Sequence, residues 1–410
     1  MKISLKIQFK LVLLAIGFFG IASLVIGATS AGEALIHDAQ SYYNEAISVA
    51  GQGIFPISAT SNANFIDRGY PLALSLGIKI FGLNNIVALQ ILNYIFWILS
   101  SWLVYLSLVK INSKYPSRLS LLMLFSPLFM TFSAKIYSEP YATFGLSLLI
   151  YSVVHLLDQE KFIGHLSLLF GAFILFSTKS IFILFVPIIL IVLLLNKRWI
   201  GILYLTISIT ILSPFLLSSS KGGRSIYNLA IQSSKLEQSY DQIFACVPYY
   251  LSYPLGKTLL PKYEAVCHQN DPNPQMDGYD SNPYVLASAK RETGFNYFDW
   301  LKLVITHPIK YTIVILVSLS NIVFFEGVYP TILIKLPMLL MLPLFVICKI
   351  ILSIYLWSRV LVVAKKENKW WLLPLIYFVI IVTNFPIESR YFYPLIPYIY
   401  FLAGFSYKKV

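Results

Sequence analysis

The sequence contains little charge for its length. Only 12% of its 410 residues are Asp, Glu, Lys or Arg, whereas soluble globular domains contain about 25%. Hydrophobic residues make up 58% of the chain, and its mean hydropathy is +0.73. Such a chain cannot cover its apolar side chains with a charged surface. An ordinary water-soluble fold is therefore excluded, and we expect an integral membrane protein.

Cysteine is also scarce, with three residues in the whole chain. This number excludes a disulfide-rich scaffold. A zinc site is not expected either, because only His268 lies near Cys267 and no second pair of ligands follows. Cys246 and Cys267 share one polar segment, so an oxidising compartment would allow them to form a disulfide. Cys348 lies within an apolar run, where we expect it to face lipid or to pack against other residues.

The apolar runs are continuous and do not alternate with polar residues, which favours helices as the spanning elements. Runs of spanning length cover residues 11–28, 86–109, 119–134, 140–157, 163–177, 180–195, 199–217, 309–325, 371–386 and 391–407. Residues 329–364 form a further apolar region, interrupted by Pro337 and Pro343, that could be one kinked span or two short ones. Two spans keep the basic clusters on one side of the membrane. We therefore expect an all-α polytopic membrane protein with about 12 transmembrane helices.

The net charge of +13 arises largely from short basic clusters beside the apolar runs. These clusters lie at residues 2–10, 110–118, 197–198, 365–369 and 408–409. The excess of Lys and Arg in cytoplasmic loops assigns the clusters, and both termini, to the cytoplasm. Acidic residues concentrate in two long polar stretches, 29–85 and 218–308, which are then outer loops. No basic stripe with interleaved aromatic residues remains, so nucleic acid is not expected as a partner.

Three parts follow from this pattern. They are an N-terminal transmembrane module (1–217), an outer cap loop (218–308) and C-terminal transmembrane helices (309–410). Within the first outer loop, residues 37–50 have helical spacing, and residues 71–82 are amphipathic enough to lie at the membrane interface.

Two acidic residues lie where predicted outer loops meet predicted spans. Asp38 follows the first apolar run, and Glu139 precedes Pro140 at the start of the run 140–157. Either could simply begin a helix, because Asp is favoured at the N-cap and an acid followed by Pro suits a first turn. Either could instead act chemically. Asp38 would then take the proton from an acceptor hydroxyl, while Glu139 would position the acceptor or help to hold a divalent cation.

Arg390 lies in the run Glu-Ser-Arg-Tyr, which the predicted topology places outside. Arg is disfavoured in outer loops, so a specific partner is expected, and its planar fork matches phosphate oxygens. An ion pair with Glu388, or contact with lipid headgroups, would explain it equally. Lys179, Lys221 and Arg224 are further cations on the same predicted face.

Four short motifs, taken in order, resemble the GT-C glycosyltransferases. These membrane enzymes take sugars from polyprenyl-phosphate donors and include protein O-mannosyltransferases and the lipid A aminoarabinose transferase. The motifs are Asp38 with Tyr42 and Tyr43, Arg68-Gly69-Tyr70-Pro71, Ser138-Glu139-Pro140 and Glu388-Ser389-Arg390-Tyr391. The middle of the chain, 218–370, contains none of them.

The resemblance implies a GT-C-like helix bundle in which Asp38 and Glu139 are the catalytic carboxylates. The cations implied to bind the donor phosphate are Arg390, Lys179, Lys221 and Arg224. The residues implied to orient the first loop are Tyr42, Tyr43, Arg68 and Tyr70. Ala39 follows Asp38 at the place where protein O-mannosyltransferases carry a second carboxylate. This difference favours a lipid or glycan acceptor over a protein.

The expected function is therefore an inverting glycosyltransferase of the inner membrane, with its active site on the extracytoplasmic face. Its expected partners are a lipid-linked sugar donor, a lipid or glycan acceptor and membrane lipids. The alternative is a transporter or flippase for a lipid-linked saccharide, although such proteins usually contain inverted repeats and ionisable residues at mid-membrane. An assembly subunit of an envelope-polysaccharide complex that has lost its chemistry is a third possibility.

Overall fold

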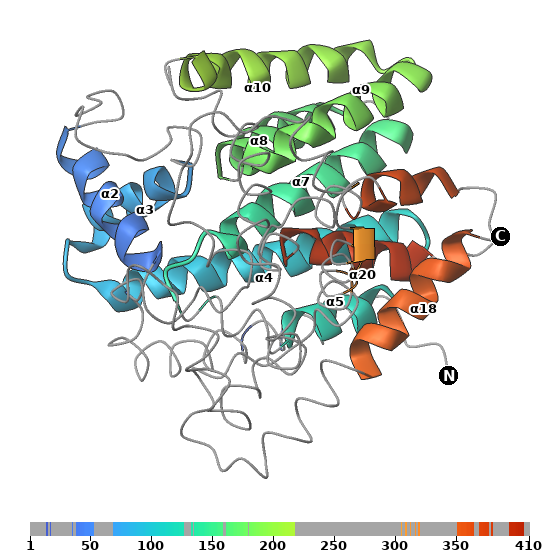
Figure 1. Ribbon diagram of the computed structural model, residues 1–410, viewed down its shortest axis with the longest axis horizontal. Helices are drawn as coiled ribbons and strands as arrows, with labels where there is room; N and C mark the ends of the chain where they lie inside the picture. Colours follow the sequence, from blue (N-terminus) through green and yellow to red (C-terminus); the bar gives the residue numbers. More distant parts are fainter. Residues whose placement is uncertain are drawn as a thin grey trace, which may run out of the picture. The chain divides into compact units, whose positions relative to one another are not determined.

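The computed structural model describes residues 38–52, 69–126, 135–158, 161–178, 180–217, 351–364, 369–376 and 393–405, together with the single residues 14, 17, 35, 133, 305, 308, 309, 312, 316, 319 and 379. Every regular element in this part of the chain is a helix, and none is a strand, as expected from the sequence (Figure 1). Residues 1–222, 354–374 and 394–410 form one compact unit, which contains nearly all of the described helices.

Four helices of this unit pack in series, each against the next (Figure 1). They are α4 (Ile86–Lys110), α7 (Glu139–Asp158), α8 (Phe162–Thr178) and α10 (Trp199–Leu217). Helices α4, with 25 residues, and α7, with 20, are long and apolar enough to cross a membrane. They confirm the predicted helices at 86–109 and 140–157. The remaining spans stay a prediction.

Glycines allow α7 and α8 to approach closely. A Cβ atom at Gly171 would lie 2.9 Å from the Gly145 carbonyl oxygen and 3.0 Å from the Leu149 backbone nitrogen. A Cβ atom at Gly145 would lie 2.9 Å from the Leu175 backbone nitrogen. Small residues at such contacts are typical of helix pairs in membranes. The pair α7–α8 therefore forms a tightly packed centre for the unit.

Two of the predicted helical runs are interrupted, and each interruption lies beside a proline. The run 119–134 was expected to be one helix, which is wrong, because α5 (Pro116–Leu124) ends ten residues earlier, shortly before Pro127. Proline disfavours a helical conformation in the residue before it. The run 180–195 divides into a 3-10 helix, η3 (Ser180–Phe185), and α9 (Val186–Leu195), with Pro187 near the start of α9. A proline ring cannot donate to the preceding turn, but it suits the first turn of a new helix.

The predicted first outer loop, residues 29–85, contains two helices, as its sequence pattern predicted, and the structure packs them against each other. They are α2 (Asp38–Gln52) and α3 (Gly69–Phe81), which lie near the end of the unit at which α4 begins (Figure 1). Gly82 has a φ of 90°, a conformation that glycine adopts readily, and it ends α3. The side chain of Asn85 then caps α4 by accepting from the Ala88 N–H at 3.1 Å. A very short turn therefore fixes α3 to α4.

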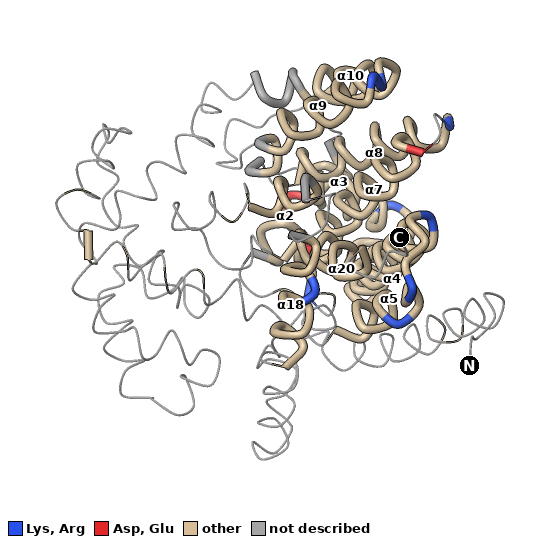
Figure 2. The backbone as a smooth tube through the Cα atoms, turned by 90° about the vertical axis from the view of Figure 1, so that its right-hand side faces the viewer, with Lys and Arg blue, Asp and Glu red and all other residues tan. Residues whose placement is uncertain are grey.

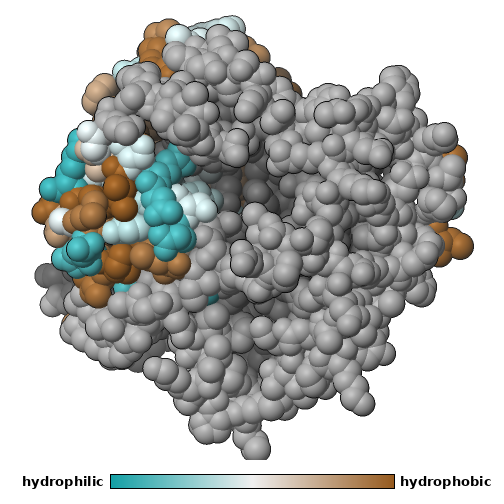
Figure 3. Space-filling view, turned by 60° about the vertical axis from the view of Figure 1, so that its left-hand side comes forward, coloured by the Kyte–Doolittle hydropathy of each residue, from teal (hydrophilic) through white to brown (hydrophobic). Residues whose placement is uncertain are grey.

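Helix α3 exposes an apolar stripe on its outer side. Leu76, Ile80 and Phe81 are more than half exposed, and Leu83 is nearly so. Apolar and hydrophilic surface patches lie next to each other on this side of the molecule (Figure 3). An exposed apolar stripe beside polar residues fits the expected place of α3 at a membrane interface.

The opposite end of the unit is rich in cations. The residues that gather there are Lys110, Lys114, Arg118, Lys161, Lys197 and Arg198, and Figure 2 shows basic positions in blue on α10 and beside α4 and α5. Lys110 Nζ lies 2.5 Å from the Asp158 carboxylate, which joins the ends of α4 and α7. Arg198 donates to the Leu157 carbonyl at 3.0 Å, which brings the start of α10 to the same place. Two basic clusters that are far apart in the sequence therefore share one end of the unit.

The C-terminal helix α20 (Ile396–Phe405) is buried against α4, α5 and α7. Its end is held by the Ser113 hydroxyl, which donates to the Gly404 carbonyl at 2.8 Å. Helix α18 (Ser353–Ala364) and the 3-10 turn η5 (Lys369–Leu372) complete the described elements. Helix α20 thus becomes part of the core of the N-terminal module, although more than 150 residues separate it from α10 in the sequence.

Candidate functional site

Tyr70 is the centre of a polar and aromatic cluster at the end of the unit remote from the basic clusters. Its side chain is 0% exposed, and its ring contacts Tyr42 of α2 and Tyr141 of α7 at centroid distances of 5.3 and 6.0 Å. Burial raises the pKa of Tyr70 well above its usual range, with a smaller contribution from the charge of Glu139 and an opposing one from a hydrogen bond to Asn93. The hydroxyl therefore stays protonated and donates a hydrogen bond.

Gly69, the residue before Tyr70, allows α3 to begin directly against α8. A Cβ atom at Gly69 would lie 2.1 Å from the Ser177 hydroxyl oxygen, closer than any side chain could approach. The Arg-Gly-Tyr-Pro motif thus has a steric reason for its glycine. This contact holds Tyr70 in the cluster and joins the first loop to the end of α8.

Asn93 connects Tyr70 to the chain segment that precedes α7. Its side-chain oxygen accepts from the Tyr70 hydroxyl at 2.9 Å. Its amide nitrogen donates to the carbonyls of Lys135 and Tyr137 at 2.7 and 3.3 Å. Asn93 is 0% exposed, so each of these bonds replaces water that cannot reach it. None of the four sequence motifs includes Asn93, although an amide within an apolar span is a recognised signal of a functional position.

Glu139 is the first residue of α7, as its sequence predicted, but it is not a surface cap. Only 1% of its surface is exposed. Helix α7 starts with the Ala142 N–H donating to the Ser138 carbonyl at 2.9 Å, while the Ser138 hydroxyl donates to the Tyr42 hydroxyl at 3.2 Å. A buried carboxylate costs free energy unless its surroundings stabilise it. A residue that only begins a helix does not need to be buried, so the burial of Glu139 points to a role beyond starting α7.

Asp38 is the first residue of α2, so its expected position at a helix start agrees with the structure. Residues four apart share one face of a helix, and Asp38 is four residues before Tyr42. Its backbone therefore lies on the face of α2 that carries Tyr42, whose ring contacts Tyr70 and whose hydroxyl contacts Ser138. The neighbouring Tyr43 is buried, and its hydroxyl donates to the Leu83 carbonyl, which fixes α2 to the turn before α4.

Lys135 is a second charged residue of the site that the motifs did not identify. It is 5% exposed, and its ammonium lies 5.8 Å from the centroid of the Tyr137 ring. The buried cation Lys135 and the buried anion Glu139 are therefore only four residues apart in the sequence. Its position in the sequence could have identified Lys135, because the predicted topology places it on the outer face, where cations are disfavoured.

Seven predicted residues lie outside the described part of the chain, and their predictions stand as made. They are Arg68, Lys179, Lys221, Arg224, Cys246, Cys267 and Arg390. Gly69, which follows Arg68, is in contact with Ser177, which lies two residues before Lys179 in the sequence. Among the described residues, no group of three or more His, Cys, Asp or Glu side chains could hold a metal ion.

The disulfide prediction can be tested directly. If the cap loop lies in an oxidising compartment, mass spectrometry of unreduced, alkylated protein should find Cys246 linked to Cys267. Cys348, which is expected in an apolar run, serves as the internal control and should be alkylated only after unfolding. Free thiols at both Cys246 and Cys267, in protein purified without reductant, would contradict this prediction.

No protein-family model, curated protein or solved structure matches the chain. The cluster itself combines a buried carboxylate, a buried cation and tyrosyl hydroxyls beside the start of α2. Carboxylate and tyrosyl groups of this kind can orient a hydroxyl group and accept a proton.

Proposed function

We propose that this protein is a multi-pass membrane glycosyltransferase with a GT-C-like fold. It transfers a sugar, with inversion, from a polyprenyl-phosphate donor to an envelope lipid or glycan acceptor on the extracytoplasmic face of the inner membrane. One observation carries the proposal. The contacts of Tyr42 with Ser138 and Tyr70 bring the helix that begins with Asp38 to the helix that begins with the buried Glu139.

The charge distribution supports the proposed orientation. Helix α4 runs from the cluster to Lys110, and its 25 residues extend about 37 Å, enough to cross the apolar part of a bilayer. The end at Lys110 carries the concentrated cations, which favours the cytoplasm for that end. The cluster around Tyr70 is then extracytoplasmic, in a bundle for which we propose about 12 spans.

In the proposed reaction, an acceptor hydroxyl oxygen attacks the anomeric carbon of the donor sugar from the face opposite the phosphate. A bond forms between this oxygen and the anomeric carbon while the bond from that carbon to the phosphate oxygen breaks. The Asp38 carboxylate takes the hydroxyl proton. The bond electrons leave with polyprenyl phosphate, whose negative charge Arg390 stabilises, with the other predicted cations, Lys179, Lys221 and Arg224.

The test is a transfer assay with the purified full-length chain. The protein is incubated with a pool of radiolabelled polyprenyl-phosphate sugars and an envelope lipid extract, and labelled product and free polyprenyl phosphate are measured. We expect stoichiometric release of both, with inverted anomeric configuration in the product. Movement of an intact donor across proteoliposome membranes, without cleavage, would instead establish the flippase alternative.

The proposed topology can be tested with single cysteines in a chain that lacks the native ones. Cysteines at the exposed positions Ser41 and Asn84, near the cluster, should react with a membrane-impermeant maleimide added to intact spheroplasts. Cysteines at Lys161 and Lys197 should react only after permeabilisation. Labelling of either lysine position from outside would reverse the orientation and move the cluster to the cytoplasm.

A further inference from the structure

An apolar cavity lies along the half of α7 that ends at the basic clusters. Its volume is about 390 Å³, within the usual range for small-molecule sites. It is lined by residues of α7, η3, α9, the segment 371–374 and the start of α20. Along α7 it extends from Leu146 to Leu157, about 16 Å at 1.5 Å per residue. This length matches half of a hydrocarbon core of about 30 Å, which is one leaflet of a bilayer.

The interior of this cavity suits a hydrocarbon chain. Its lining is aliphatic and aromatic except for Asn196 and Tyr398. The Asn196 amide donates to the Val192 carbonyl of its own helix at 2.7 Å, and the Tyr398 hydroxyl donates to the Trp371 carbonyl. The Asn196 amide nitrogen and the Tyr398 hydroxyl therefore donate within the protein, so the lining offers a ligand mainly apolar contact.

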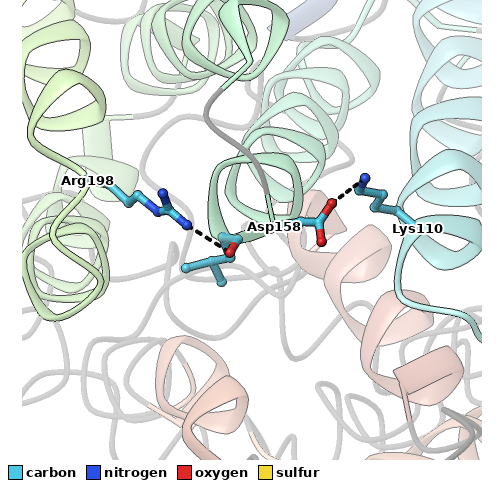
Figure 4. Close-up of polar contacts among 4 residues, drawn as sticks. Lys110, Asp158 and Arg198 are labelled. Atoms are coloured by element: carbon cyan, nitrogen blue, oxygen red, sulfur yellow. Dashed lines mark hydrogen bonds and ion pairs between the residues drawn. The ribbon is translucent and has the colours of Figure 1, made fainter.

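Cations surround the end of the cavity at Leu157 and Asn196. Arg198 donates to the carbonyl of Leu157, a lining residue, at 3.0 Å (Figure 4). Lys197 follows Asn196 and is exposed. The nearby carboxylate of Asp158 is paired with Lys110 at 2.5 Å, as Figure 4 shows, and does not offset the other cations. The rim therefore has a positive excess, and the lining also includes Trp371, a residue type that is enriched at membrane interfaces.

We infer that this cavity binds an acyl chain of an anionic phospholipid from the cytoplasmic leaflet, with the lipid phosphate at Lys197 and Arg198. Basic pockets between helices on the cytoplasmic side are suited to anionic headgroups, because each cation near the surface contributes about 1 kcal/mol. The bound chain would fill the space between α7 and α9. The proposed sugar donor acts at the opposite end of α7, so the inference does not depend on sugar transfer, but its assignment to the cytoplasmic leaflet rests on the orientation proposed above.

The first test compares two lipids that differ only in the headgroup. Native mass spectrometry of the full-length protein in detergent follows binding of dioleoylphosphatidylglycerol and of dioleoylphosphatidylcholine. We expect saturable binding of the anionic lipid, about 25-fold tighter than that of the zwitterionic lipid for two cations at the rim. Equal affinities would overturn the headgroup assignment. Displacement of bound phosphatidylglycerol by equimolar undecaprenyl phosphate would assign the cavity to the donor chain and overturn the inference.

The second test compares a variant of the cavity lining and a variant of the basic rim, each with a matched control. Val192→Trp fills the cavity, whereas Leu194→Trp adds the same group to a position on α9 that is 45% exposed and does not line it. Val192→Trp should abolish saturable phosphatidylglycerol binding, and Leu194→Trp should preserve it. Lys197→Gln should weaken phosphatidylglycerol binding about fivefold and leave phosphatidylcholine unchanged. Its control is Lys79→Gln, an exposed cation on α3.

Binding that persists unchanged in both Val192→Trp and Lys197→Gln would show that the lipid lies elsewhere. Size-exclusion profiles and thermal unfolding establish that each variant is folded. If Val192→Trp does not fold, the comparison of the two lipids and the Lys197→Gln variant still test the inference. Neither of these tests alters the packed interior of the protein.

Discussion

Asp38→Asn is expected to leave the protein folded and to reduce sugar transfer by about 10²- to 10⁴-fold. Asparagine keeps the size of aspartate and its preference for helix starts, so α2 should still begin at this residue. The amide cannot accept the proton of the acceptor hydroxyl. The measurement is the single-turnover rate with bound polyprenyl-phosphate sugar, together with the thermal unfolding midpoint.

Two further variants separate the roles of the other predicted residues. Glu139→Gln should lower the transfer rate with little change in stability if the buried carboxylate acts on the acceptor or on a cation. If Glu139 only begins α7, the same variant should lose a little stability and keep its activity. Arg390→Ala should weaken donor binding as well as turnover, because the phosphate is present in both the ground state and the transition state. Near-normal transfer by Asp38→Asn would place the base elsewhere.

Asn93→Leu is expected to destabilise the protein by about 3 kcal/mol, at roughly 1 kcal/mol for each of three buried hydrogen bonds. Leucine has a similar volume but cannot bond to the Tyr70 hydroxyl or to the carbonyls of Lys135 and Tyr137. The freed segment should also release Glu139 from its position and lower the rate of transfer. The free energy of unfolding in detergent and the single-turnover rate measure these two effects.

Ser107→Ala is the matched control for this variant. Ser107 is also buried on α4, but its hydroxyl donates only to the Leu103 carbonyl of the same helix, at 2.8 Å. Its loss should change stability little. Tyr70→Phe removes a single donor of the cluster and should cost about 1 kcal/mol. An Asn93→Leu protein with unchanged stability would mean that the hydrogen bonds of Asn93 do not hold the segment before α7.

The helix boundaries show which features a local sequence pattern predicts correctly and which it misses. Hydropathy located α4 and α7 within a few residues, and the acid beside Pro140 marked the start of α7. The same reasoning overlooked the breaks next to Pro127 and Pro187 because it weighed average hydropathy above single residues. A proline acts on one turn of helix, and an average over a long apolar run conceals that effect.

The sequence by itself determined the helical class of the described part, its apolar character, and the helix starts at Asp38 and Glu139. Each of these depends on composition or on neighbours within one or two turns, which a linear pattern records. Only the tertiary structure decided that Asn93 bonds to Tyr70 and to Lys135, that Lys135 and Glu139 are buried, and that a cavity lies along α7. These features arise from packing between segments distant in sequence, because a buried hydrogen bond or a cavity exists only once several helices surround it.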